Sequence, residues 1–290
     1  MERQLWKAIV ACLRRIDKSI PVAAEDYTDA RIIEVYLWAV LHDRPMSWVC
    51  QPRNWPPAMR RRPLPSDSCM SRRLKSERVI ALLAALEEHV VRRPEAGGLV
   101  WFMDGKPLTI SGVSKDRQAG YGRAAAGKAK GYKIHALVGV NNTLAAWRLA
   151  PMNVDERVMA ERLLRTKGVQ GYVVTDANYD SNRLHAECDA RGDLQMVTPR
   201  RHGPGRGHGH RKQRPGRLRA KDILENPMPW FGRDLLRQRG QIERYFGHLT
   251  SWGGGLTHLP PWVRTHRRVY RWVQAKLIAA HTRHQMRQTT

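Results

Sequence analysis

The spacing of apolar residues changes near residue 98, and this change constrains the fold more than any other feature of the sequence. Between residues 5 and 16, apolar side chains recur at the spacing of one helix face. Residues 99–103 instead form an uninterrupted apolar run, which is typical of a buried strand. We therefore predict a helical domain over residues 1–95 and an α/β domain over residues 96–290.

The helical domain has the features of a small DNA-binding module. Helical patterns cover residues 29–42 and a short stretch after Pro45, and Ser66 is a suitable N-terminal cap for a third helix. Short helices joined by turns, the last of them rich in cations, are typical of a helix-turn-helix DNA reader. The alternative is a helical bundle with a solvated basic face. The last helix would expose Arg72, Arg73, Lys75 and Arg78, and we expect the first three to contact DNA.

Strands and helices alternate in the rest of the chain, which favours a mixed sheet flanked by helices. Asn141 and Asn142 form a strong turn signal, so the two strands beside them are expected to form a hairpin. We expect strands at residues 99–103, 132–140, 144–149, 171–175 and 194–198, and helices at residues 155–167, 182–191, 233–250 and 263–285.

One segment of this second domain is unusually basic. Residues 200–221 contain nine Lys or Arg and no acid, together with five Gly. Such a composition favours a flexible basic loop without a core of its own, which we place at residues 200–222.

The charge of the whole chain indicates a polyanionic partner. Fifty-one Lys and Arg against 26 Asp and Glu give a formal net charge of +25. A folded protein with this charge attracts nucleic acid before other partners. An anionic membrane is the alternative, but no apolar run approaches the ~20 residues of a transmembrane helix.

The N-terminus and the cysteines indicate a cytosolic or nucleoid-associated protein. Charged residues interrupt the first 20 positions, so the uncharged core of a signal peptide is missing. The cysteines are widely separated, which favours free thiols in a reducing compartment over a zinc site or disulfides. They are Cys12, Cys50, Cys69 and Cys188.

Two carboxylates directly follow predicted apolar strands, Asp104 and Asp176. A carboxylate at the end of a buried strand is unfavourable unless a cation meets it. In a protein that binds a phosphodiester, a divalent metal shared by several carboxylates meets this need. Glu243, on a predicted helix, is the candidate for the third acid. Taken singly, each of these acids is more simply explained as a turn residue, a helix cap or a surface charge.

Three blocks of the sequence resemble the signature blocks of bacterial insertion-sequence transposases with a DDE nuclease domain. They are residues 102–105, 173–180 and 239–246. The middle block is similar to that family's Asp-x-Gly/Ala-Tyr-Asp box, and the last is similar to its pattern of Arg, three residues and Glu. Residues 130–135 resemble the family's first hairpin, and residues 64–76 its N-terminal helix-turn-helix.

The chain departs from the family pattern at three positions. Leu236 and Thr250 stand where the family has Tyr and Lys beside the last block, and Asn178 stands where Gly is frequent in the middle block. Because Asn adopts positive φ more readily than most residues, the turn of the middle block can be retained.

The resemblance implies an RNase H-like fold in which Asp104, Asp176 and Glu243 bind metal and carry catalysis. The implied cofactor is a pair of Mg²⁺ ions, with Mn²⁺ as a substitute, which would activate a water or 3′-hydroxyl and stabilise the leaving oxygen. The implied function is cleavage of transposon ends followed by strand transfer into target DNA. The implied partners are double-stranded DNA and a second copy of the chain, in a bacterial cytoplasm.

Further cations are expected to contact DNA near the cut. Lys133 and His135 alternate with the apolar side of their strand and are placed to line a DNA channel. Arg239 lies one helical turn before Glu243 and is expected to orient that carboxylate or bind a phosphate, with a plain surface ion pair as the equal alternative. Arg244 or His248 is a candidate replacement for the missing Tyr and Lys contacts.

Two other functions are compatible with parts of the sequence. A DNA-binding regulator, or a silent transposase remnant, would use the basic surface and leave the acids with structural roles. A general nuclease on the same fold would cut DNA without preference for end sequences and would not join strands.

Overall fold

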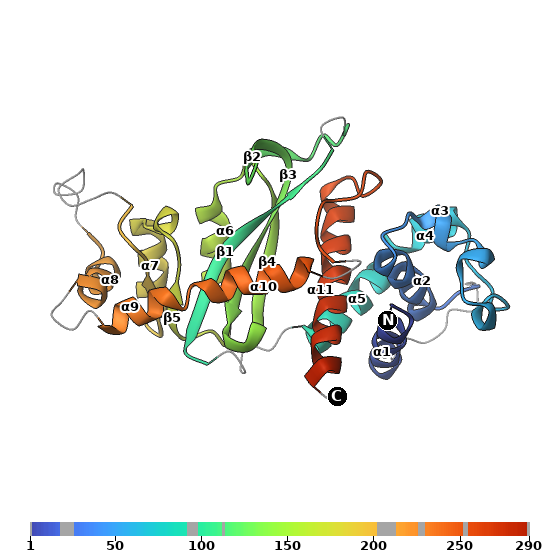
Figure 1. Ribbon diagram of the computed structural model, residues 1–290, viewed down its shortest axis with the longest axis horizontal. Coiled ribbons are helices and arrows are strands. Elements are labelled where there is room, and N and C mark those ends of the chain that lie inside the picture. The colour runs from blue at the N-terminus through green and yellow to red at the C-terminus, as the bar shows by residue number, and fades with distance from the viewer. Residues whose placement is uncertain are drawn as a thin grey trace. The chain divides into compact units, whose positions relative to one another are not determined.

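The computed structural model describes residues 2–17, 26–91, 98–111, 114–201, 213–225, 230–251 and 255–288 (Figure 1). The chain forms two compact units. The helical unit combines Met1–Val91 with Leu249–Thr290, and the sheet unit is Arg92–His248. No helix in the described part of the chain is long and apolar enough to cross a membrane.

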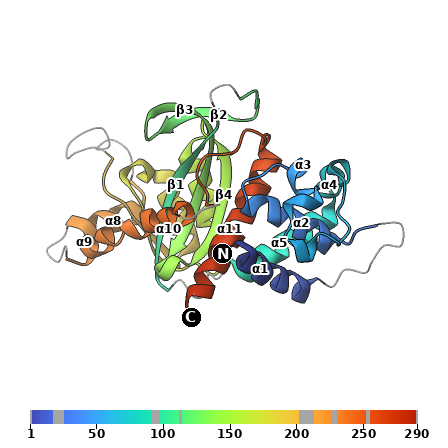
Figure 2. The ribbon, with the colours of Figure 1, turned by 45° about the vertical axis from the view of Figure 1, so that its right-hand side comes forward.

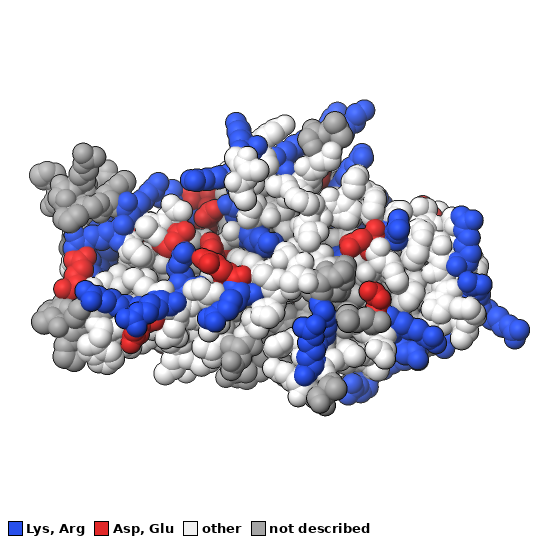
Figure 3. Space-filling view, in the orientation of Figure 1, with Lys and Arg blue, Asp and Glu red and all other residues white. Residues whose placement is uncertain are grey.

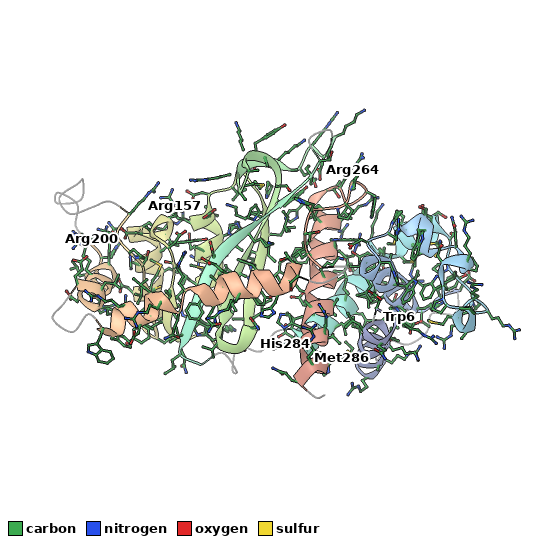
Figure 4. The ribbon with its side chains drawn as sticks, viewed as in Figure 1. Trp6, Arg157, Arg200, Arg264, His284 and Met286 are labelled. Atoms are coloured by element: carbon green, nitrogen blue, oxygen red, sulfur yellow. The ribbon has the colours of Figure 1, made fainter. Side chains whose placement is uncertain are left out.

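The helical unit is built around α2, in which every residue except Arg31 is buried. A helix that is apolar all round must be covered on every side, and α1, α5 and α11 pack against it. Trp6 (labelled in Figure 4) meets Trp38 of α2 edge to face, with ring centroids 5.8 Å apart. The helices of this unit are α1 (Glu2–Ile16), α2 (Asp29–Leu41), α3 (Met46–Val49), α4 (Asp67–Arg73), α5 (Glu77–Val90) and α11 (His266–Gln288), with 3-10 turns at Pro52–Asn54 and Pro57–Met59.

The C-terminal helix α11 belongs to the helical unit, whereas the sequence analysis assigned it to the catalytic domain at residues 96–290. Nearly all of its central residues, Val269–Ala279, are buried, and the helix packs against α1, α2 and α5. Gln274 on α11 donates a hydrogen bond of 2.7 Å to Glu87 on α5. The apolar spacing of α11 indicates a buried helix but not which neighbours bury it, so the observed domain boundary differs from the predicted one.

The sheet unit contains a mixed six-stranded sheet with the order β2-β3-β1-β5-β6, and β4 pairs with β3. β1 is antiparallel to β3 and parallel to β5, and β5 is parallel to β6. The predicted hairpin is formed by β3 and β4. The expected α/β class, a mixed sheet with helices after a helical N-terminal region, is confirmed (Figures 1 and 2). The strands are β1 (Val100–Thr109), β2 (Gly120–Ala124), β3 (Gly127–Gly139), β4 (Leu144–Pro151), β5 (Gly171–Val174) and β6 (Leu194–Val197).

The two faces of the sheet have different neighbours. Trp101 and Met103 of β1 join a core cluster with residues of α6 and α7. Because side chains alternate along a strand, Asp104 points to the opposite face. Tyr172 of β5 lies on that face and contacts Phe231 of α9, with ring centroids 5.3 Å apart. The helices of the unit are α6 (Glu156–Leu164), α7 (Asn182–Arg191), α8 (Pro215–Glu225), α9 (Trp230–Arg237) and α10 (Gly240–Thr250).

Several elements differ from the sequence-based expectation. β1 continues beyond Asp104, so this residue lies within the strand and not after it. The helix expected at residues 233–250 is interrupted between α9 and α10. The loop expected at residues 200–222 contains the start of α8 from Pro215, and its residues 202–212 lie outside the described residues. The strand β2 was not predicted.

Candidate active site

The parallel pairing of β1 and β5 brings Asp104 and Asp176 together. Phe102 on β1 is the register partner of Val174 on β5. Asp104 and Asp176 each lie two residues beyond this pair along the chain, Asp104 still within β1 and Asp176 at the turn that follows β5. The two apolar strands from which these acids were predicted are thus parallel neighbours in the sheet.

The glycine after Asp104 shapes both faces of β1. The Gly105 amide donates a hydrogen bond of 2.7 Å to the Asp104 carboxylate. A Cβ at position 105 would lie 2.8 Å from Lys133 Cδ and 3.1 Å from His135 Nδ1. The absence of a side chain at position 105 therefore allows Lys133 and His135 to pack against β1. This packing explains why a glycine follows Asp104.

Asp176 is held in place through both its side chain and its backbone. Its carboxylate caps the 3-10 turn Ala177–Tyr179 and accepts a hydrogen bond of 2.8 Å from the Asn178 amide. Its carbonyl accepts a hydrogen bond of 2.7 Å from the Thr198 hydroxyl, which lies just after β6. The capping role proposed as an alternative for this acid is thus real, and it also fixes the position of the carboxylate beside Asp104.

The carboxylates around Asp104 repel one another. The pKa of Asp104 is raised to about 6, mainly by burial and also by the charges of Asp176 and Glu156. The Gly105 amide and the Arg239 guanidinium act in the opposite direction. Burial and the neighbouring carboxylates both disfavour the charged form of Asp104, and a cation between the two aspartates would favour it.

Two functional candidates at this site were missed by the sequence analysis. Glu156 is the first residue of α6, where an acid is ordinary because it interacts with the helix dipole, so nothing in the sequence singled it out. Tyr179 lies in the middle signature block and is 1% exposed. Burial raises the pKa of Tyr179, and the charges of Glu156, Asp104 and Asp176 raise it further.

Glu243 is not grouped with the two aspartates. It lies on α10, which passes over β1 in both ribbon views (Figures 1 and 2). Its side chain is 64% exposed, and its Oε1 is 3.3 Å from a guanidinium nitrogen of Arg239, one helical turn away. In the described part of the chain, no three His, Cys, Asp or Glu side chains are placed to hold one metal ion. The expected convergence of three carboxylates is therefore not found among the described residues, and Glu243 instead pairs with Arg239 on its own helix.

Two cations that were expected to line a DNA channel have other roles. Lys133 forms an ion pair with Glu156, and only 12% of its side chain is exposed. His135 is 1% exposed. Burial, with a smaller contribution from the Lys133 charge, lowers the pKa of His135 to about 3. A neutral, buried imidazole does not supply charge to a phosphate, so the DNA-contact prediction for His135 is corrected.

The last aspartate of the middle block is part of a buried ion pair. Asp180 accepts two hydrogen bonds of 2.7 Å from the Arg217 guanidinium on α8 and one of 3.2 Å from the Arg201 amide. The side chains of Asp180 and Arg217 are 3% and 8% exposed. This pair attaches α8 to the turn that carries Asp176.

Several arginines of the sheet unit lie on the elements that follow β4, β6 and α9. Arg157 and Arg200 are labelled in Figure 4, the first on α6 and the second after β6. Each is paired with an acid of its own, Arg157 with Asp155 and Arg200 with Glu225. Arg244 on α10 is exposed, as the sequence analysis expected of a DNA contact.

In the helical unit, the cations predicted to contact DNA fall into two groups. Arg72 and Lys75 are exposed. Arg73 is 7% exposed, and its guanidinium lies 2.7 Å from the carboxylate of Asp29, which also pairs with Arg78. Arg73 holds α4 to α2 and is not accessible to DNA, so its predicted role is corrected. Consecutive positions on a helix face different sides, which separates Arg72 from Arg73.

Replacing Arg73 should affect stability, whereas replacing Arg72 should affect DNA binding. Arg73→Gln is expected to destabilise the protein by about 2 kcal/mol, because it removes one of two cations from a buried carboxylate. Arg72→Gln is expected to leave stability within about 0.5 kcal/mol and to weaken DNA binding. Urea unfolding and fluorescence anisotropy with labelled duplex DNA measure the two effects. Equal stabilities of the two variants would contradict the assignment.

The aspartate pair fits a divalent cation. Carboxylate oxygens are the ligands that Mg²⁺ takes in proteins, usually one or two of them together with phosphate oxygens of the substrate. Asp104 within β1 and Asp176 just after the neighbouring β5 offer such oxygens, and the charge of Asp176 adds to burial in raising the pKa of Asp104. A contribution from Glu243 requires that its carboxylate leave Arg239.

Comparison with known proteins identifies the family. The description of the matching family is "Transposase DDE domain", and it matches residues 95–280, which is more than half of the chain. The matched segment contains all three acids, Asp104, Asp176 and Glu243. Among curated proteins, no significant match to the chain is found. The mixed sheet with its aspartate pair is thus the RNase H-like domain expected from the sequence, and the chain belongs to the transposase DDE domain family.

Proposed function

We propose that this protein is the DNA transposase of an insertion sequence and that it cleaves the element's ends and joins them to target DNA. The observation that supports the proposal is the parallel pairing of β1, which carries Asp104, with β5, which Asp176 follows, within a domain of the transposase DDE family. A net charge of +25 suits a protein that must bind DNA ends and target DNA together.

The residues of the site have separate tasks in this proposal. Asp104 and Asp176 bind divalent metal and thereby position the phosphate to be cleaved. When bound, a pair of Mg²⁺ or Mn²⁺ ions supplies an activated water or 3′-hydroxyl and stabilises the leaving 3′ oxygen. Thr198 and Asn178 hold Asp176 through the hydrogen bonds at 2.7 and 2.8 Å, so its carboxylate does not have to be ordered during the reaction.

Glu243 is proposed as the third ligand. Glu243 lies on α10 one helical turn from Arg239. The Arg239 charge lowers the pKa of Asp104, which supports an approach of α10 to the aspartate pair. Rotation of the exposed Glu243 side chain away from Arg239 would free its carboxylate for metal. Arg239 would then be free to bind a DNA phosphate, the other role that the sequence suggested for it.

Binding of DNA is proposed to involve both units. In the helical unit, Arg72 and Lys75 are exposed beside the turn between α4 and α5, a helix-turn-helix arrangement. In the sheet unit, Arg244 is exposed on α10. Because an insertion sequence has two ends, two copies of the chain are expected to assemble on DNA.

The test is a cleavage assay with the DNA that flanks the coding sequence of this chain. With Mg²⁺, we expect the full-length protein to nick these duplexes at the element boundary, to leave 3′-hydroxyl ends and to join them to a second DNA. Chelation of the metal should stop both steps. Nicking without boundary preference and without joining would indicate a general nuclease. Binding without cleavage in Mg²⁺ and in Mn²⁺ would indicate a regulator.

A further inference from the structure

A two-stranded ribbon extends the sheet unit at one end. It consists of β2, Gly120–Ala124, paired with residues 127–131 at the start of β3. No side chain of β2 is buried, and the first residues of β3 are exposed or partly exposed. The side of β2 that carries Gly120 and Gly122 lies close to Met152 and Asn153, whereas Tyr121 and Arg123 on the other side are exposed and available for a surface role.

The ribbon presents cations and no carboxylate. The only acid between residues 105 and 154 is Asp116, and it is 3% exposed. Its carboxylate accepts hydrogen bonds of 2.9 Å from the Tyr132 hydroxyl and from the Gln118 amide, which anchors the base of the ribbon. The exposed charges of the segment are therefore all positive. They are Lys115, Arg117, Arg123 and Lys128.

An exposed aromatic ring lies among these cations. Tyr121 on β2 is 57% exposed, and the ammonium group of Lys128 on β3 lies 5.8 Å from the centre of its ring. At the turn, residues 124–127 are three alanines and a glycine, so the tip is narrow. In Figure 3, Lys and Arg side chains project from the end of the sheet at which β2 and β3 lie in Figure 1.

The ribbon is continuous with the strand that carries Asp104. Thr109, the last residue of β1, is the register partner of Gly131, where the ribbon begins. The five residues from Asp104 to Thr109 span about 17 Å at the rise of an antiparallel strand. This distance equals about five base pairs of duplex DNA. A duplex with its scissile phosphate at Asp104 therefore comes within reach of the ribbon.

We propose that this ribbon is a second DNA-binding element, which enters a groove of duplex DNA about five to ten base pairs from the phosphate at Asp104. The major groove admits a two-stranded ribbon of this kind. The small side chains of the tip allow close approach to the groove floor, and Arg123 and Lys128 reach the flanking phosphates. The inference rests on the proposed function for the presence of DNA, and it adds a contact that the helix-turn-helix and α10 do not supply.

The test compares two double variants that remove the same charge. Arg123→Gln/Lys128→Gln is expected to weaken duplex binding about tenfold and to lower the slope of log Kd against log salt by about 2. Arg162→Gln/Lys167→Gln removes two exposed cations before β5 and serves as the control. Because it lowers the net charge by the same amount, any change in duplex affinity or in the salt slope that both double variants share is due to net charge and not to the ribbon. Binding is measured without divalent metal, so that no cleavage occurs.

A second measurement uses the unaltered protein and is independent of any effect on folding. Labelling of amines followed by mass spectrometry should show Lys128 and Lys115 protected at least about threefold by duplex DNA, with Lys167 unchanged. Equal affinity of the two double variants, or equal labelling with and without DNA, would overturn the ribbon proposal. Stronger protection by single-stranded than by duplex DNA would overturn binding in a groove. Boundary-specific cleavage by the wild-type protein would leave the proposed function standing in each case.

Discussion

Replacing Asp176 by Asn should reduce metal-dependent cleavage of end-containing DNA by about 10³-fold or more. Asn retains the size of the side chain, and its oxygen can still accept the hydrogen bond of 2.8 Å from the Asn178 amide. The cap of the turn is therefore kept, while the negative charge that attracts metal is lost. Single-turnover cleavage with Mg²⁺ measures the effect.

A loss of cleavage by Asp176→Asn indicates a loss of metal binding only if the variant still binds DNA and a matched control variant still cleaves it. Affinity for the same duplex should stay within about threefold, because Asp176 is expected to act on metal and not on the groove. Asp193→Asn removes an exposed acid that pairs with Arg191 elsewhere in the sheet unit, and its cleavage rate should equal that of the wild type. Unchanged cleavage by Asp176→Asn would show that the aspartate pair is structural, as the regulator hypothesis requires.

Replacing Arg217 by Ala should destabilise the protein by about 3–5 kcal/mol at pH 7. The Arg217 side chain donates two hydrogen bonds of 2.7 Å to Asp180, whose own side chain is 3% exposed. Without it, a buried carboxylate remains with too little compensating charge. Urea unfolding of the wild type and the variant gives the difference in the free energy of unfolding.

The loss of unfolding free energy caused by Arg217→Ala should become smaller as the pH falls. Burial alone would raise the pKa of Asp180, but hydrogen bonds from Arg217 and the Arg201 amide, together with the His185 ring nitrogen 3.6 Å away, outweigh burial and hold the pKa well below its usual value. In the wild type this stabilisation is present above the unfolded pKa, about 3.9, and is lost only at more acidic pH. In Arg217→Ala the buried carboxyl group becomes protonated at higher pH, which removes much of the penalty near pH 4.5.

The neighbouring arginine of α8 provides the control. Arg219 pairs with Asp189, but 54% of its side chain is exposed. Exposed ion pairs contribute little, so Arg219→Ala should cost at most about 1 kcal/mol. Equal destabilisation by the two substitutions would contradict the view that the Asp180–Arg217 pair anchors α8 to the turn of Asp176.

The repeating elements of the fold were predictable from the sequence because their apolar patterns are strong. The helix at residues 29–42 and the hairpin around Asn141 follow directly from periodicity and turn chemistry, and both are observed. Ser66 caps α4 as predicted, with its side chain accepting a hydrogen bond of 3.1 Å from the Cys69 amide. The proximity of Asp104 and Asp176 was predictable once their strands were taken as parallel neighbours.

Elements without an apolar pattern were missed. β2 contains two glycines and no buried residue, so neither hydrophobic alternation nor β-propensity marks it as a strand. Its pairing with residues 127–131 depends on the extension of β3 beyond the part that lies in the sheet core. The same reason explains why the ribbon was not proposed as a DNA contact from the sequence.

Tertiary partners account for the remaining differences. Arg72 and Arg73 are identical in type and adjacent, yet only the structure shows that Asp29 buries one of them. Lys133 and Glu156 are 23 positions apart, and their ion pair removes the lysine from the predicted DNA channel. Periodicity specifies which residues are buried, but not which side chains meet there.

The most direct test of the proposed site is the anomalous scattering of Mn²⁺ in crystals of the protein with an end-containing duplex. The account predicts a peak about 2.1 Å from carboxylate oxygens of both Asp104 and Asp176. It also predicts that Glu243 has turned from Arg239 toward the metal. A structure without a peak between the two aspartates, or with the Arg239 guanidinium in that position, would contradict the proposed chemistry.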